Sequence, residues 1–231
     1  MRLFGLERNL KNNMIFTDLT DDDRRDIIDY VSGETGFLRN VVEKDWWVTS
    51  VLRAIFSLPY AEHTSFKGGT NLSKCWGLIQ RMSEDIDIGI SREFLGFSGE
   101  ISKNQISDRL RRASCSFVRN IMRHDVENAL LAQGISPEAI VVTVQETKIS
   151  TVDPETIYVS YQSLYESDGY ILPQVKIEVS GRSMTEPVSK VFVRSYISEN
   201  LPKLTFADNP VEVNAVIPQR TFLEKLFLLH E

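Results

Sequence analysis

The stretch FKGGTNLSKCWGLIQRMSEDIDIGI, residues 66–90, decides the fold of this chain. It reads as a short strand, a Gly68-Gly69 turn, a helix and a second strand. Asp85 and Asp87 stand within that second strand, although aspartate is a poor strand former. Because side chains alternate along a strand, we expect both carboxylates on one face and the isoleucines on the other. Such a conflict with local preference is typical of a functional site.

The chemistry of this stretch indicates a nucleoside-triphosphate site. Two carboxylates this close repel each other unless a cation lies between them, and one or two Mg²⁺ ions with oxygen ligands are the usual solution. Gly68 and Gly69 allow backbone N–H groups at a helix start to approach an anion. Thr70 adds a hydroxyl there, either to cap the helix or to donate to a phosphate.

The order of strand, Gly-Gly, helix and D-x-D strand carries this interpretation, because other phosphate or nucleophile motifs are absent. The chain lacks GxxxxGK[ST], GxGxxG and GxSxG. A purely structural alternative stays open, in which the glycines form a turn and the aspartates pair with Arg81 or Lys74.

Composition excludes several classes of protein. The 231 residues are 42% hydrophobic and 25% charged, as in an ordinary globular protein. The net charge of −6 argues against a surface built throughout for nucleic acid, and DNA is not an expected partner. The two cysteines have no zinc-like spacing, and no apolar run predicts a membrane span. We therefore expect a cytoplasmic protein.

Hydrophobic periodicity predicts an α/β (α+β) fold with a mixed sheet. Helices are expected at 17–36, 43–58, 102–133 and 218–231, and strands at 140–147, 155–162, 174–180, 190–197 and 211–216. The last helix stops at Glu231 in mid-pattern, which predicts only the start of a truncated C-terminal helical region.

The long helix at 102–133 carries two different stripes. Its apolar stripe is expected at Ile106, Leu110, Ala113, Phe117 and Ile121. A second face gathers Arg109, Arg112, Arg119 and Arg123. This second face is either a solvated surface or a contact surface for an RNA backbone.

The segment KGGTNLSKCWGLIQRMSEDIDI resembles the signature of the DNA polymerase beta-like nucleotidyltransferase superfamily, and specifically of its AbiEii/MenT toxin group. EKDWWVTSVLRAIF and PQRTFLEKLFLLH also resemble that group. The resemblance implies a polymerase beta-like core at 61–217, an N-terminal helical part at 1–60 packed on it, and the start of a C-terminal helical region at 218–231.

The resemblance also implies further site residues. A third carboxylate from a later strand corresponds to Glu178 in VKIEVS, which would complete the metal site with Asp85 and Asp87. Lys225 matches a lysine on a C-terminal helix near the active site. Lys67 and Ser83 join the nucleotide-binding group of Gly68, Gly69 and Thr70.

The function implied is magnesium-dependent transfer of NMP from an NTP to an acceptor hydroxyl, with tRNA as the acceptor. The protein would be the toxin of a toxin-antitoxin or phage-defence pair, with a cognate antitoxin as partner. Two alternatives stay open: a nucleotidyltransferase that adds AMP to protein, and a catalytically silent nucleotide-binding module.

Overall fold

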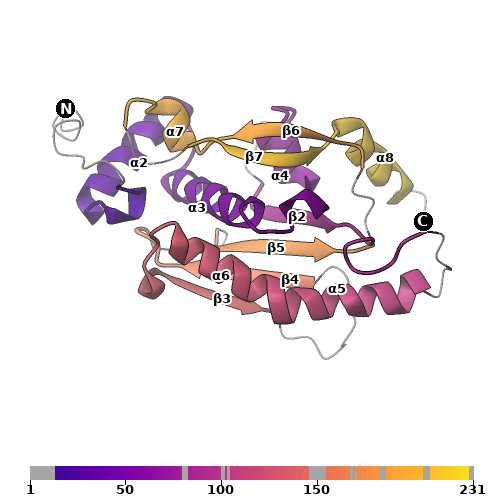
Figure 1. Ribbon diagram of the computed structural model, residues 1–231. Coiled ribbons are helices and arrows are strands. Elements are labelled where there is room, and N and C mark those ends of the chain that lie inside the picture. The colour runs from indigo at the N-terminus through magenta and orange to yellow at the C-terminus, as the bar shows by residue number, and fades with distance from the viewer. Residues whose placement is uncertain are drawn as a thin grey trace.

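The computed structural model describes residues 14–79, 83–99, 102, 105–145, 155–166, 169, 171–182, 186–204 and 209–228. Its centre is a seven-stranded sheet with the order β3-β4-β5-β2-β1-β7-β6 (Figure 1). The strands are β1 Thr64–Lys67, β2 Asp85–Ile90, β3 Ile140–Val144, β4 Glu155–Tyr161, β5 Gln174–Ser180, β6 Val188–Val193 and β7 Val211–Val216.

The sheet is mixed, as the sequence predicts. β2 lies at its centre, parallel to β5 and antiparallel to β1. β1 is parallel to β7, while the outer pairs β3–β4, β4–β5 and β6–β7 are antiparallel. Strands far apart in the sequence therefore meet at β2.

Helices surround this sheet. The α-helices are α2 Asp21–Thr35, α3 Arg39–Phe56, α4 Gly68–Lys74, α5 Arg111–Phe117, α6 Arg123–Ala132, α7 Tyr196–Asn200 and α8 Pro218–Leu228. Short 3₁₀ turns are η1 Phe16–Asp18, η2 Ala61–His63 and η5 Pro137–Ala139, and π-helical turns are η3 Gln105–Leu110 and η4 Val118–Met122. No helix in the described ranges is long and apolar enough to cross a membrane.

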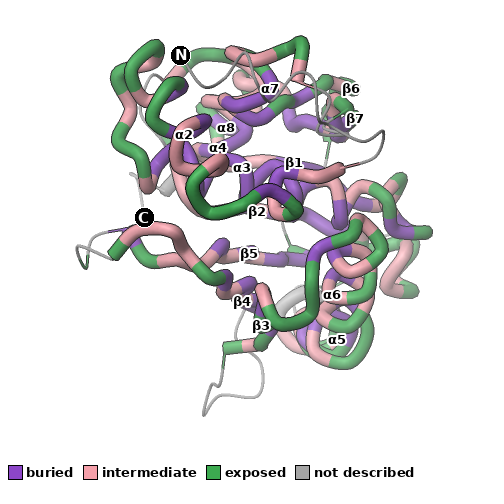
Figure 2. Tube along the Cα trace, turned by 90° about the vertical axis from the view of Figure 1, so that its left-hand side faces the viewer, coloured by how far each residue is buried: buried purple, intermediate pink, exposed green. Residues whose placement is uncertain are grey.

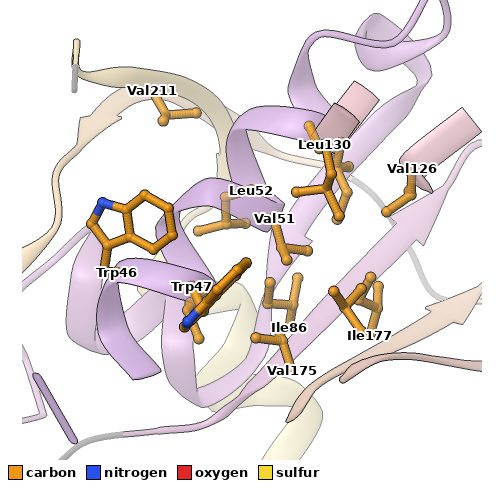
Figure 3. Close-up of a cluster of buried hydrophobic side chains, with 14 of the residues drawn as sticks. Trp46, Trp47, Val51, Leu52, Ile86, Val126, Leu130, Val175, Ile177 and Val211 are labelled. Atoms are coloured by element: carbon orange, nitrogen blue, oxygen red, sulfur yellow. The ribbon is translucent and has the colours of Figure 1, made fainter. Parts of the chain in front are cut away.

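One hydrophobic cluster joins the N-terminal helices to the sheet. Trp47 and Val51 of α3 lie beside Ile86 and Val175 from the two central strands, and Trp46 belongs to the same cluster (Figure 3). Nearly the whole length of α3 is buried (Figure 2). α3 is therefore part of the core, and each of its buried large apolar side chains contributes about 1.5–3 kcal/mol to the folding free energy.

Two predictions from periodicity are wrong in detail. The strand expected at 190–197 ends at Val193, because Ser195 caps α7 by accepting a hydrogen bond from the Ser198 amide. On the long helix, Ile121 is 47% exposed, whereas Val118 and Met122 are buried. The π-helical turn at 118–122 shifts the apolar stripe, because its wider turns depart from the 3.6-residue period.

Candidate functional site

Asp85, Asp87 and Glu178 lie together on two neighbouring strands. β2 and β5 pair in a register that puts Asp87 opposite Glu178, as the resemblance leads us to expect. Ile86 and Ile88 alternate with the aspartates and are fully buried in the core. The three carboxylates therefore share the sheet face opposite that core.

Asp87 is the half-buried carboxylate next to Glu178. Burial, together with the nearby charge of Glu178, raises the pKa of Asp87 to about 6. A hydrogen bond with Glu178 acts in the same direction, while Lys67, directly across from Asp87 on β1, lowers this pKa. The carboxylate group thus carries negative charge that its protein neighbours only partly balance.

A lysine that the sequence reasoning did not single out lies among these carboxylates. Lys176 Nζ is 2.6 Å from Glu178 Oε1 and 3.6 Å from Asp85 Oδ2. The hydrogen bond to Glu178 raises the pKa of Lys176. The period of two along VKIEVS already puts Lys176 and Glu178 on one face, so this neighbour could have been found from the sequence.

The residues present fit a hard divalent cation once Lys176 moves. Three carboxylates supply the oxygen ligands that Mg²⁺ prefers, and burial together with the nearby Glu178 disfavours the ionised form of Asp87 while no further cation is present. Among the described residues, no group of His, Cys, Asp or Glu is already arranged to hold a metal ion. The ammonium group of Lys176 lies between Asp85 and Glu178.

The glycine pair makes room for these side chains. Gly68 has φ +75°, and a Cβ placed on it would lie 1.8 Å from Asp87 Oδ2. A Cβ on Gly69 would lie 2.8 Å from Ser83 Oγ. The start of α4 therefore approaches both Asp87 and Ser83, and at Gly68 the positive φ and the contact with Asp87 favour glycine.

Thr70 has a different partner from either one expected. Its side chain is buried, and its hydroxyl donates to the main-chain oxygen of Asp85. Thr70 thereby links α4 to the first residue of β2. The structural alternative for the aspartates is not realised with Lys74, which pairs with Asp45 at 2.5 Å; Arg81 lies outside the described residues.

Lys225 lies on α8, which starts beside α4. The carbonyl of Val216, two residues before α8, accepts hydrogen bonds from Asn71 and Trp76. Lys225 is exposed and lies about 10 Å along the helix from this start. Among the predicted site residues, Lys225 is the most distant from the carboxylates in sequence.

The four arginines do not share the face of the carboxylates. Their helix packs through Val118 and Met122 against the apolar face of the sheet, opposite the carboxylates. Arg119 pairs with the buried Glu155 at 2.8 Å, and Arg123 donates to the Val142 carbonyl at 3.1 Å. The other two, Arg109 and Arg112, are exposed, and Arg112 pairs with Asp108 at 2.9 Å.

Comparison with known proteins identifies a family for this chain. A comparison with curated proteins gave no match. A family model described as "Nucleotidyl transferase AbiEii toxin, Type IV TA system" matches residues 50–231, which include every site residue named above. The chain therefore belongs to the AbiEii family of nucleotidyl transferase toxins of type IV toxin-antitoxin systems.

Proposed function

We propose that this protein transfers NMP from an NTP to the 3′ hydroxyl of tRNA, with Mg²⁺ held by Asp85, Asp87 and Glu178. The observation that carries the proposal is the register of β2 and β5, which sets Glu178 against Asp87 beside the glycine pair. Bound Mg²⁺ would supply charge stabilisation for the phosphates and the leaving pyrophosphate.

The residues of the chain divide the remaining work. The backbone N–H groups of Gly68 and Gly69 bind the β- and γ-phosphates, and Ser83, next to Gly69, offers a hydroxyl. Lys67 balances negative charge next to Asp87. Glu178 accepts the proton of the attacking hydroxyl, which then attacks the α-phosphorus.

Two more lysines, Lys176 and Lys225, offset negative charge at the proposed site. Without a metal ion, the positive charge of Lys176 offsets the repulsion between the Asp85 and Glu178 carboxylates. When the triphosphate complex forms, Lys176 gives up these two ion pairs. Lys225 on α8 contributes positive charge toward the triphosphate.

tRNA as the acceptor rests on the resemblance to the AbiEii/MenT group and on exposed positive charge. Arg109 is exposed on the long helix and Arg112 forms only an exposed pair with Asp108, whereas Arg119 and Arg123 are bound within the protein. We expect RNA to reach the carboxylate face and to extend past the edge of the sheet toward this helix. A cognate antitoxin is the expected protein partner, as the family description implies.

The test is an assay with each of the four α-labelled NTPs, Mg²⁺, total tRNA and total cellular protein. Label on tRNA that disappears in Asp85→Asn with Asp87→Asn supports the proposal. Label on protein would replace tRNA by a protein acceptor. NTP binding without release of pyrophosphate would indicate a silent module, and transfer that persists in the double variant would refute the site.

A further inference from the structure

Three consecutive charged residues of α3, Glu43, Lys44 and Asp45, are buried. Their exposed fractions are 1%, 3% and 3%. Charged side chains are almost never buried to this extent unless they are paired, because an unpaired charge loses its hydration on burial and gains nothing in return. Successive residues of a helix point in different directions, so each member of this triplet contacts a different part of the fold.

Lys44 connects the segments that lead into both carboxylate-bearing strands. Its Nζ donates to Glu84 Oε2 at 2.5 Å and to the Leu172 carbonyl at 3.1 Å. Glu84 directly precedes Asp85 of β2, and Leu172 lies two residues before β5. One ammonium group thus ties together the segments that lead into β2 and β5.

Asp45 connects α4, the helix that begins with the glycine pair, to α3. Its Oδ1 accepts from Lys74 Nζ at 2.5 Å, and its Oδ2 accepts from the Tyr196 amide at 2.7 Å. Lys74 is the last residue of α4 and also lies over the Tyr196 ring, 5.1 Å from its centroid. The helix that begins with Gly68 is therefore tied at its far end to α3.

We propose that Lys44 and Asp45 are positioning residues of the nucleotidyl transfer site, a role that rests on the proposed function. Together they tie α4, β2 and β5, the three elements that carry the glycine pair and the carboxylates, to one buried helix. Both residues precede the segment 50–231 that matches the family model. A change at Lys44 is expected to alter the spacing between Asp85 and Glu178 without touching either.

Glu43 offers a matched control within the same turn of helix. Its carboxylate accepts from Ser163 Oγ at 2.5 Å and from the Leu164 amide at 2.8 Å. This partner segment carries none of the proposed site residues. Glu43→Gln therefore disturbs a buried charge of similar exposure and leaves the ties to β2, β5 and α4 in place.

The experiment compares Lys44→Met, Lys44→Arg and Glu43→Gln with wild type. Unfolding free energies come from urea denaturation, and binding of Mg²⁺ in the presence of ATP comes from calorimetry on the folded proteins. We expect Lys44→Met and Glu43→Gln both to lose stability. Only Lys44→Met should also bind Mg²⁺ about tenfold more weakly, and Lys44→Arg should recover most of that loss.

Glu84→Gln breaks the same ion pair from its more exposed end, and it serves if Lys44→Met does not fold. Equal Mg²⁺ affinity in Glu84→Gln, Glu43→Gln and wild type overturns the inference. If wild type itself binds no Mg²⁺, the proposed function fails instead. Hydrogen exchange at 84–90 then decides about positioning: faster exchange in Glu84→Gln than in Glu43→Gln supports it, and equal exchange overturns it.

Discussion

Replacing Gly68 by alanine tests the closeness of α4 to Asp87. The new Cβ would lie 1.8 Å from Asp87 Oδ2 and 2.6 Å from its Cγ, whereas ordinary van der Waals contact begins at 3.4 Å. Asp87 must therefore move. Gly77 provides the matched control, because it has a similar φ of +62° and no atom within 4 Å of its added Cβ.

The two substitutions share one energetic cost and differ in the other. Alanine in the left-handed region costs about 1–2 kcal/mol, and Gly77→Ala should lose only this amount. Gly68→Ala adds a steric conflict with Asp87 of about 1–3 kcal/mol. This conflict is not easily relieved, because β2, which carries Asp87, is paired with β1 on one side and β5 on the other. The difference between the two unfolding free energies therefore measures the clash with Asp87 alone.

Urea denaturation of both variants gives this difference, and calorimetry gives the Mg²⁺ affinity of each. We expect Gly68→Ala to be the less stable variant and to bind Mg²⁺ more weakly, with Gly77→Ala binding as wild type does. Equal stability of the two variants, with unchanged Mg²⁺ binding by Gly68→Ala, would show that the glycine does not make room for Asp87.

Three further predictions concern charge. Burial and neighbouring carboxylates raise the pKa of Asp87 to about 6, so its ionised form is disfavoured in the folded state. The metal-free protein should lose stability as the pH rises from about 4 to about 6, and urea denaturation in EDTA should show no such loss in Asp87→Asn. Lys176→Met should strengthen Mg²⁺ binding about fivefold in calorimetry, roughly 1 kcal/mol, because the competing ammonium is gone; weaker binding would contradict the competition. Arg119→Ala should lower the unfolding free energy by about 3 kcal/mol, because the buried Glu155 loses its partner. Arg112→Ala, which breaks an exposed pair, should cost under about 1 kcal/mol, and equal losses would refute the distinction.

Local patterns in the sequence are sufficient to predict how the side chains of β2 face, at the centre of the sheet. The period of two in SEDIDIGI predicts one face for Asp85 and Asp87, and the structure places both there. The position of Glu178 beside them came from the resemblance, since the pairing of β2 with β5 joins distant segments. The catalytic roles of these residues stay predictions.

Long-range partners explain what the sequence did not reveal. EKD in α3 has the composition of an exposed helix turn, yet Lys44 and Asp45 are buried because their partners come from Glu84, Leu172, Lys74 and Tyr196. The arginine face of the long helix likewise could not be assigned from charge alone. Arg119 serves a buried glutamate on β4, which no local pattern connects to it.

The position of β5 in the centre of the sheet has a consequence for the order of synthesis. β2, with its two aspartates, leaves the ribosome long before β5, yet β2 pairs with β5 on one side. A nascent or interrupted polypeptide that ends before Glu178 lacks one of the three acids. If the proposed function holds, the cell that makes this toxin therefore meets no active enzyme until most of the polypeptide has been translated and folded.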